Sequence, residues 1–192
     1  MVLDSLLELF IGAIWFILPA YFANGSPVIV GGGRPIDGGR NWRDGKRLFG
    51  DGKTYRGFIG GVIIGTAIGF IQFFFESQNG LNYSPIFRGF LLAFGALSGD
   101  LIGSFIKRRI NIPRGSPALG MDQLGFMIVG VILVIIAFPL TLANYNFNLE
   151  IPFLGSLHLQ YTFENFIAYI IILFPLTFLA HITSNLIVRR TI

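Results

Sequence analysis

The sequence contains no cysteine, which excludes disulfide bonds and thiolate metal sites. Charged residues are also scarce: they make up 12% of the 192 residues, whereas a soluble domain contains about a quarter. Since 53% of the residues are hydrophobic, the composition excludes an ordinary soluble domain and predicts an integral membrane protein. No basic residue precedes the first apolar run, which argues against a cleaved signal peptide.

Five apolar windows are long enough to cross a bilayer, which takes about 20 residues. They are residues 6–23, 57–75, 87–106, 124–143 and 163–187. Basic residues cluster after the first, third and fifth windows, whereas the opposite side has Arg88 as its only base. The windows predict one all-α membrane domain over residues 1–192 with five transmembrane helices. The positive-inside rule then places the N-terminus outside and the C-terminus in the cytoplasm. Segments 24–56 and 107–123 become two cytoplasmic loops, which we expect to form the active site.

Asp100 lies inside the third apolar window, about two helical turns before a basic triplet. A carboxylate at that depth is costly unless it faces a cavity, a cation or a partner, so it is a candidate functional residue. Asp122 opens the fourth window, and we expect both carboxylates at one depth, close enough to share a metal ion. Ser104 and Arg108 follow Asp100 on the same helical face. The triplet Lys107-Arg108-Arg109 is thus either a stop-transfer cluster or the mouth of a phosphate-binding site.

The longest polar segment, residues 28–56, is rich in glycine. Asp37, Asp44 and Asp51 stand seven residues apart and each precedes a glycine, a pattern typical of ordered turns. Glycine-rich backbone can form an anion-binding concavity. Lys53, Thr54 and Arg56 add side-chain donors, although the spacing of a P-loop is missing. The alternative is a solvated loop whose glycines are flexible linkers.

Glycines recur at small-residue spacing in two windows. The second window carries Gly57, Gly61, Gly65 and Gly69, and the third carries Gly95, Gly99 and Gly103. Since glycines on one face let helix backbones approach closely, we expect the second and third helices to pack tightly together. The same packing would place Asp100 beside the helix seam and away from lipid.

Three further polar positions are open to two interpretations each. Asn24 either ends the first helix or lines the mouth of the site. His181 and Asn185 share one face of the last helix at the depth of Asp100, where they either form an interhelical hydrogen bond or reach the site. Residues 144–162 are expected to form an exterior loop with turns.

Several motifs of the chain together resemble the archaeal CDP-archaeol synthases, relatives of the CDP-diacylglycerol synthases. The resemblance covers nearly the whole chain. Its motifs are Ala23–Pro27, Pro35–Gly39, Asp44–Lys46, Gly50–Gly57, Ser98–Asp100 and Lys107–Arg109.

The resemblance implies transfer of CMP from CTP to unsaturated archaetidic acid, an isoprenoid-ether lipid phosphate, with release of pyrophosphate. It implies Mg²⁺ held by Asp100 and Asp122, leaves room for a second, monovalent cation, and is compatible with a homodimer in the cell membrane. Catalytic roles fall on Asp100, Asp122 and Lys53. The expected nucleotide-binding residues are Asn24, Asp51, Lys53, Thr54, Gly99, Ser104, Lys107 and Arg108. The expected lipid-phosphate-binding residues are Arg56, Arg109, His181 and Asn185.

Two other functions account for part of the pattern. A small anion channel or phosphate transporter would also need basic loops and an intramembrane Asp, but it would carry polar residues through both halves of the membrane. A CDP-alcohol phosphotransferase would share the Asp44-Gly45 pair but needs further aspartates at helical spacing. Nucleic acid is excluded as a partner, because the basic loops flank apolar spans and lack interleaved aromatics.

Overall fold

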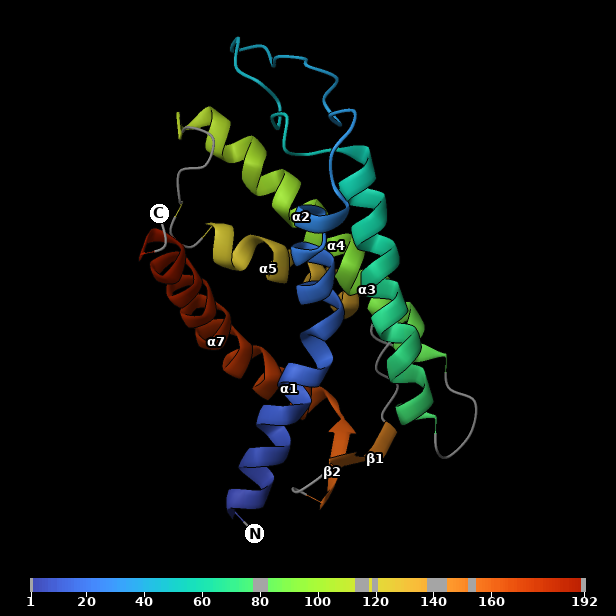
Figure 1. The fold of residues 1–192 in the computed structure, drawn as a ribbon. Helices are drawn as coiled ribbons and strands as arrows, with labels where there is room; N and C mark the ends of the chain where they lie inside the picture. Colours follow the sequence, from blue (N-terminus) through green and yellow to red (C-terminus); the bar gives the residue numbers. More distant parts are fainter. Residues whose placement is uncertain are drawn as a thin grey trace.

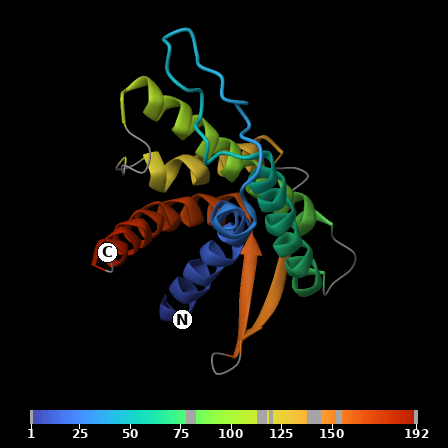
Figure 2. The same cartoon turned by 45° about the horizontal axis from the view of Figure 1, so that its top comes forward.

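The structure, a computed structural model, describes residues 2–77, 83–112, 118, 121–137, 145–151 and 155–190. Its long helices are α1 (Val2–Gly25), α3 (Tyr55–Glu76), α4 (Ser84–Arg109), α5 (Met121–Ile136) and α7 (Phe163–Arg190). Helix α1 lies between α3 and α7, and α4 contacts α1, α3 and α5 (Figure 1). A short helix, α2 (Pro27–Val30), follows α1, and the loop from α2 to α3 projects from that end of the bundle (Figure 2).

Within the described residues, three stretches are both long and apolar enough to cross a membrane: Ser5–Val30, Tyr55–Glu76 and Ser84–Arg109. They contain the first three predicted windows. Helices α5 and α7 hold shorter apolar stretches, Leu124–Ile136 and Glu164–Leu179, where the last two windows were expected. Residues 138–143 of the fourth window lie outside the described residues. The chain is therefore a mostly helical membrane protein.

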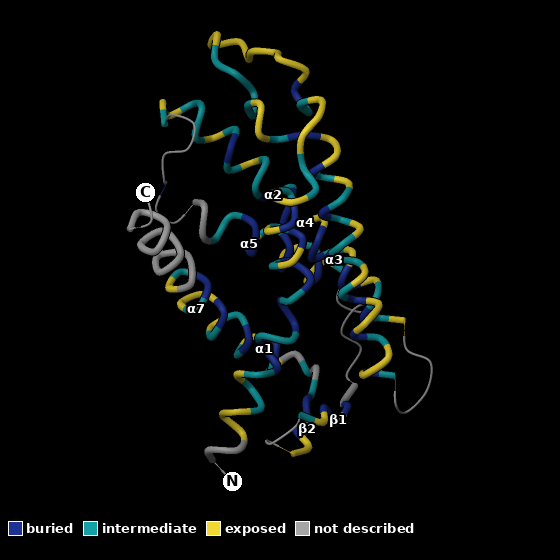
Figure 3. Tube along the Cα trace, viewed as in Figure 1, coloured by how far each residue is buried: buried dark blue, intermediate teal, exposed yellow. Residues whose placement is uncertain are grey.

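The expectation of an all-α chain needs one correction, because part of the expected exterior loop is an antiparallel hairpin. Strand β1 (Tyr145–Ile151) pairs with β2 (Gly155–Tyr161), with Phe147 opposite Leu159 and Leu149 opposite Leu157. These four side chains are buried, whereas the residues between them are exposed (Figure 3). The alternation of apolar and polar residues is the signature of a half-buried strand, and it stands beside turn residues in the same segment. The hairpin closes the core that α1, α5 and α7 form around Phe16 and Tyr169.

The glycine stripe of α3 packs as expected. A Cβ atom at Gly65 would lie 2.5 Å from the Ala93 Cβ atom of α4 and 2.7 Å from the Pro19 carbonyl oxygen of α1. At Gly69 it would lie 2.9 Å from the Gly89 Cα atom. Since real Cβ atoms do not approach so closely, only glycine permits α3 to sit in the groove between α1 and α4.

The glycine stripe of α4 has a different partner from the one predicted. A Cβ atom at Gly95 would lie 2.4 Å from the Gly130 Cα atom, and one at Gly99 would lie 2.3 Å from the Gly125 carbonyl oxygen. Both partners belong to α5, so this stripe packs against α5 and not against α3. The four-residue spacing of glycines predicts a smooth face on a helix, but it does not identify the helix that packs against that face.

A buried ion pair joins α3 and α4 near the hairpin end. Arg88 donates to both carboxylate oxygens of Glu76 at 2.6 and 3.2 Å, and neither side chain is exposed. Gln72 accepts from Arg88 at 3.2 Å and donates to the Trp15 carbonyl oxygen at 2.6 Å. The Trp15 indole donates to Glu76 at 2.7 Å. The apolar runs of these helices therefore also contain charged residues, which pair across helices.

Candidate active site

The glycine-rich loop between α2 and α3 is folded around the carboxylate of Asp37. That carboxylate accepts hydrogen bonds from the backbone N–H groups of Gly39 (3.0 Å), Phe49 (3.1 Å) and Gly50 (2.9 Å). The Arg47 guanidinium donates two more, at 2.8 and 3.2 Å. Gly39 and Gly50 have φ angles of +83° and +106°, which glycine adopts without strain. The prediction of ordered turns is confirmed, and the alternative of a flexible linker is wrong.

The environment of Asp37 acts on its pKa in two opposing directions. Burial alone would raise the pKa, but the hydrogen bonds from Arg47 and from the backbone of Gly50, Gly39 and Phe49 lower it well below its usual range. The Asp37 carboxylate therefore stabilises the folded loop fully above its ordinary pKa of about 3.9. This contribution is lost as the pH falls below that value towards the folded-state pKa.

We expect Asp37→Asn to loosen the loop at neutral pH, because asparagine cannot accept all five hydrogen bonds with charge assistance. The fluorescence of Trp42, obtained as the difference from a Trp42→Phe variant, should shift to longer wavelength. The unsubstituted protein should show that shift only below about pH 4. Asp51→Asn, which removes an exposed pair with Arg47, is the control and should leave the spectrum unchanged. An unchanged spectrum in Asp37→Asn would contradict the role given to this carboxylate.

Arg109 fastens the loop to the end of α4. Its Nε atom lies 3.0 Å from an Asp44 carboxylate oxygen, and its Nη2 atom donates to the carbonyl oxygens of Lys46 (3.3 Å) and Arg47 (2.5 Å). Lys46 returns a bond from its ammonium group to the Arg109 carbonyl oxygen at 3.0 Å. The guanidinium also lies over the Phe105 ring, 4.6 Å from its centroid. Arg109, predicted to bind the lipid phosphate, is thus engaged in holding the loop.

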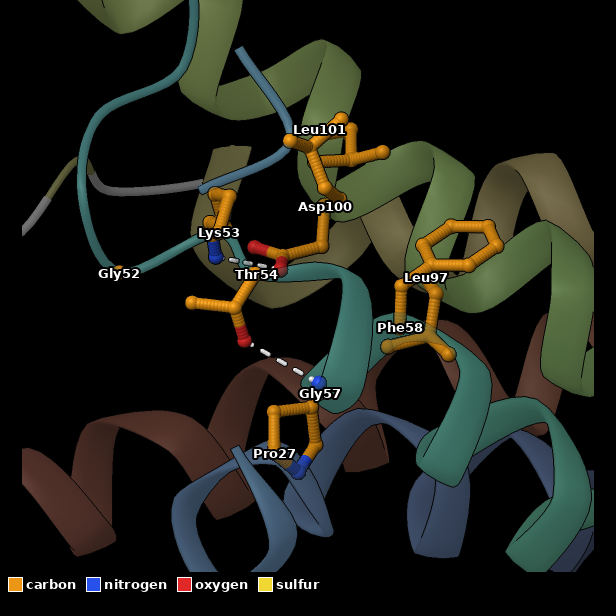
Figure 4. Close-up of a pocket in the computed structure, with 10 residues that line it drawn as sticks. Pro27, Gly52, Lys53, Thr54, Gly57, Phe58, Leu97, Asp100 and Leu101 are labelled. Carbon is orange, nitrogen blue, oxygen red and sulfur yellow. Dashed lines mark hydrogen bonds and ion pairs between the residues drawn. The ribbon is translucent and has the colours of Figure 1, made fainter. Parts of the chain in front are cut away.

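Lys53 connects the end of the loop to the middle of the bundle through an ion pair with Asp100 (Figure 4). About 30% of each side chain is exposed, 28% for Lys53 and 30% for Asp100, so both groups are open to a ligand. The pair joins residues 47 positions apart, which sequence spacing could not reveal. Next to it, the Thr54 hydroxyl accepts from the Gly57 N–H at 3.1 Å and caps the start of α3.

Two pockets lie on either side of Lys53. The basic pocket is lined by Phe49, Gly50, Gly52, Lys53, Ser104, Lys107 and Arg108. The apolar pocket is lined by Pro27, Ile36, Gly52, Lys53, Thr54, Gly57, Phe58, Leu97, Asp100 and Leu101 (Figure 4). The first offers cations to an anionic ligand, and the second offers hydrocarbon surface with one ion pair at its side.

The structure brings most of the predicted site residues to this end of the molecule. Lys53, Thr54, Asp100, Ser104, Lys107 and Arg108 line one pocket or both. Among the described residues, Asn24, Asp51, Arg56 and Gly99 do not line either pocket: Asn24 is half-buried at the end of α1, Arg56 is exposed, and Gly99 packs against α5. Asp51 forms an exposed pair with Arg47 at 2.7 Å.

Three predicted site residues cannot be placed. Asp122 belongs to α5, and His181 and Asn185 belong to α7. The side chains of all three are outside the described part of the structure. Sequence reasoning also missed the structural roles of Asp37, Asp44 and Arg109. The signal for the first two was present in their Asp-Gly turns, whereas nothing in the spacing pointed Arg109 at Asp44.

Comparisons with known proteins find relatives that match most of this chain. A model of the CarS-like family, described as CDP-archaeol synthase, matches residues 6–173. The CDP-archaeol synthase of Thermococcus kodakarensis is 68% identical over 117 residues, which cover 60% of this chain and 68% of that protein. The enzyme of the same name from Methanocaldococcus jannaschii is 42% identical over 162 residues, covering 78% and 92%. A solved structure, described as an intramembrane enzyme for archaeal membrane lipids biosynthesis, has a TM-score of 0.64 at 35% identity and covers 91% of this chain and 92% of its own.

Proposed function

The chain belongs to the CDP-archaeol synthase family, and from this premise we propose where its substrates bind and how its side chains promote their reaction. The protein is a cytidylyltransferase that forms CDP-archaeol from CTP for membrane lipid biosynthesis. The observation that carries the proposal is the Lys53–Asp100 pair, in which Lys53 lines both a basic and an apolar pocket and Asp100 lines the apolar one. Nothing in the comparisons supports a transporter, a channel or a CDP-alcohol phosphotransferase.

CTP binds with its triphosphate in the basic pocket. Lys107, Arg108 and Lys53 supply positive charge there, and the Ser104 hydroxyl supplies a further donor. Positive phi angles at Gly50 and nearby glycines let the loop backbone approach phosphate oxygens closely. The loop that Asp37 orders and Arg109 fastens thus forms one wall of a preorganised anion site.

The lipid phosphate reaches Lys53 from the apolar pocket, where Phe58, Leu97 and Leu101 provide surface for its hydrocarbon. Arg56 stands beside the pocket in the first turn of α3 and is exposed. It meets the lipid phosphate and clamps two of its oxygens, a geometry that a lysine cannot match. His181 and Asn185 remain candidates for the same group.

The reaction joins the two phosphates without a strong base, because a phosphate monoester is largely ionised at neutral pH. An oxygen of the lipid phosphate attacks the α-phosphorus of CTP, and the bond from that phosphorus to the pyrophosphate oxygen breaks. Lys53 neutralises charge on the oxygens between the two pockets, while Lys107 and Arg108 stabilise the leaving pyrophosphate. The protein therefore contributes alignment and charge, with no covalent intermediate.

Asp100 fits a magnesium ligand, because its partly exposed carboxylate lines the apolar pocket that the lipid phosphate enters and pairs with Lys53, which also lines the basic pocket. Magnesium sites of this kind need only one or two carboxylates, completed by phosphates and water. Asp122 is the proposed second ligand. When bound, the ion would neutralise negative charge on the phosphate oxygens. We also propose that the site binds a second, monovalent cation.

We propose five membrane spans in one domain over residues 1–192, with the N-terminus outside and the C-terminus cytoplasmic. The loop with exposed Arg34, Arg40 and Arg43 supports this orientation, because basic loops stay in the cytoplasm. CTP is present on that side. The site then faces the cytoplasm and receives the lipid from the bilayer. A homodimer is compatible with this arrangement.

The proposal is tested by separating the two substrates kinetically. Arg56→Lys should raise the apparent KM for the lipid phosphate about tenfold and leave that for CTP nearly unchanged, since a two-pronged clamp is lost. Arg108→Ala should raise the apparent KM for CTP at least tenfold and spare that for the lipid. Purified protein in detergent, labelled CTP, Mg²⁺ and each substrate in turn at saturation give both values.

Arg43→Ala, an exposed loop base that does not line either pocket, controls for a general loss of positive charge. It should leave both KM values unchanged. If Arg56→Lys and Arg108→Ala both raise the apparent KM for CTP and leave that for the lipid phosphate unchanged, the two pockets form a single nucleotide site. The proposed division between the substrates is then wrong. If the unsubstituted protein forms no CDP-lipid, the proposed function itself is wrong.

A further inference from the structure

Phenylalanine side chains continue the apolar pocket along the membrane-facing surface of α4. Phe58 lines the pocket, and its ring packs edge-on against Phe94, with centroids 5.8 Å apart and an interplanar angle of 88°. Phe90 stacks on Phe94 with centroids 6.0 Å apart. Together with Phe87, these residues form one exposed row at helical spacing, each about 40% exposed (39%, 39% and 40%).

Leu97 and Leu101 belong to the same row of α4 and line the pocket itself. The row thus leads from the exposed Phe87, near the other end of the helix, to the buried Leu97 and the half-buried Leu101, beside Asp100. We call the residues Phe87, Phe90, Phe94, Leu97 and Leu101 the α4 row. At about 1.5 Å per residue it is about 21 Å long. Half of a bilayer's hydrocarbon core measures about 15 Å, so the row can accommodate the whole length of a lipid chain.

The pocket opens at the level of the membrane. Helix α2 forms its edge through Pro27, and the next two side chains, Val28 and Ile29, are 90% and 86% exposed. Two neighbouring apolar side chains with so much free surface, at the end of a stretch long and apolar enough to span a membrane, are suited to contact with hydrocarbon. The opening beside Pro27 therefore faces lipid, while Lys53 and Asp100 lie at the inner side of the same pocket (Figure 4).

We propose that a hydrocarbon chain of the lipid phosphate lies along the α4 row and passes the Phe58–Phe94 pair where it leaves the pocket. This inference rests on the proposed function, because the occupant is the lipid substrate. The edge-to-face rings present a corrugated surface with gaps between them. A methyl-branched isoprenoid chain fills such gaps better than a straight chain does. The two rings therefore make the enzyme select branched chains.

The test measures chain selectivity in Phe58→Ala and Phe94→Ala. Both variants should raise the apparent KM for the isoprenoid lipid phosphate by about tenfold, the effect of losing most of one buried aromatic contact. The ratio of kcat/KM for isoprenoid over straight-chain lipid phosphate should fall at least fivefold. The apparent KM for CTP should be unchanged. Lipid concentrations are expressed as mole fractions in the detergent micelle.

Phe74→Ala is the matched control, because Phe74 is a 64% exposed phenylalanine on α3 that contacts Phe70 and Phe73 away from the pocket. It should change neither KM nor selectivity. Leu101→Trp tests the same path by filling the pocket. It should raise the apparent KM for the lipid phosphate and leave that for CTP unchanged. Thermal unfolding of each variant verifies that it is folded.

The inference is overturned if Phe58→Ala and Phe94→Ala keep the selectivity and the lipid KM of the unsubstituted protein while CDP-lipid is still formed. It is also overturned if Phe74→Ala loses selectivity to the same extent, since the effect would then be general to membrane-facing aromatics. Either result leaves the proposed function standing, because CTP-dependent synthesis persists. Absence of product from the unsubstituted protein with every lipid phosphate would instead remove the proposed function.

Discussion

Replacing Asp100 with asparagine is expected to lower kcat by about 10²- to 10³-fold, the loss typical of removing one preorganised electrostatic group. The substitution keeps the size of the side chain but removes the charge that pairs with Lys53 and that we assign to Mg²⁺. Asp122→Asn should have a comparable effect. Turnover is measured in detergent with saturating CTP, lipid phosphate and Mg²⁺.

The control is Glu150→Gln, which removes an exposed carboxylate from the hairpin and should leave turnover unchanged. A double variant, Lys53→Met with Asp100→Leu, asks whether the pair is only structural. A structural pair would regain activity once both charges are gone, whereas a catalytic pair would not. Turnover of Asp100→Asn within about threefold of the unsubstituted protein would refute the catalytic role.

Glu76→Leu is expected to destabilise the protein by about 3–5 kcal/mol, because Arg88 would keep a fully buried charge without its carboxylate. For a chain of this size, that change corresponds to a fall of roughly 10 °C in melting temperature. Thermal unfolding in detergent measures the shift. The Trp15 indole would lose its acceptor as well, which adds to the effect.

The double variant Glu76→Leu with Arg88→Met separates the charge from the packing. Replacing both members of a buried pair by apolar residues of similar size is often nearly neutral, so the double variant should regain most of the lost stability, although the Trp15 indole still lacks its acceptor. If the double variant is as unstable as Glu76→Leu, the hydrogen bonds to Gln72 and Trp15 carry the stability and the ion pair does not.

Local patterns were sufficient for the helices and for the turns of the loop. The apolar windows predicted the membrane helices because a bilayer requires long runs of nonpolar residues. The Asp-Gly pairs predicted ordered turns because the side chain of Asp37 accepts from nearby backbone donors and glycine permits the positive φ angles between them. Both signals depend on residues a few positions apart.

The hairpin was predictable in principle, since its apolar and polar residues alternate over Phe147–Glu150 and Leu157–Gln160. The partner of the Gly95 and Gly99 stripe was not, because a stripe of glycines fits any smooth helix and only the packed bundle selects α5. The same holds for Arg109, whose guanidinium could have met phosphate and instead holds Asp44 and two loop carbonyl oxygens.

The sequence by itself determined that this is a membrane protein and that its motifs are those of a cytidylyltransferase. It also showed two basic segments, one on each side of the apolar window that contains Asp100. Only the tertiary structure decided that Lys53 meets Asp100 and that Lys53 lines both a basic pocket and an apolar one. Composition and short-range spacing can be read directly from the sequence. The contact between Lys53 and Asp100, 47 residues apart, depends on how the loop docks on α4. That docking depends on the simultaneous packing and pairing of residues from separate elements, which no single stretch of sequence specifies.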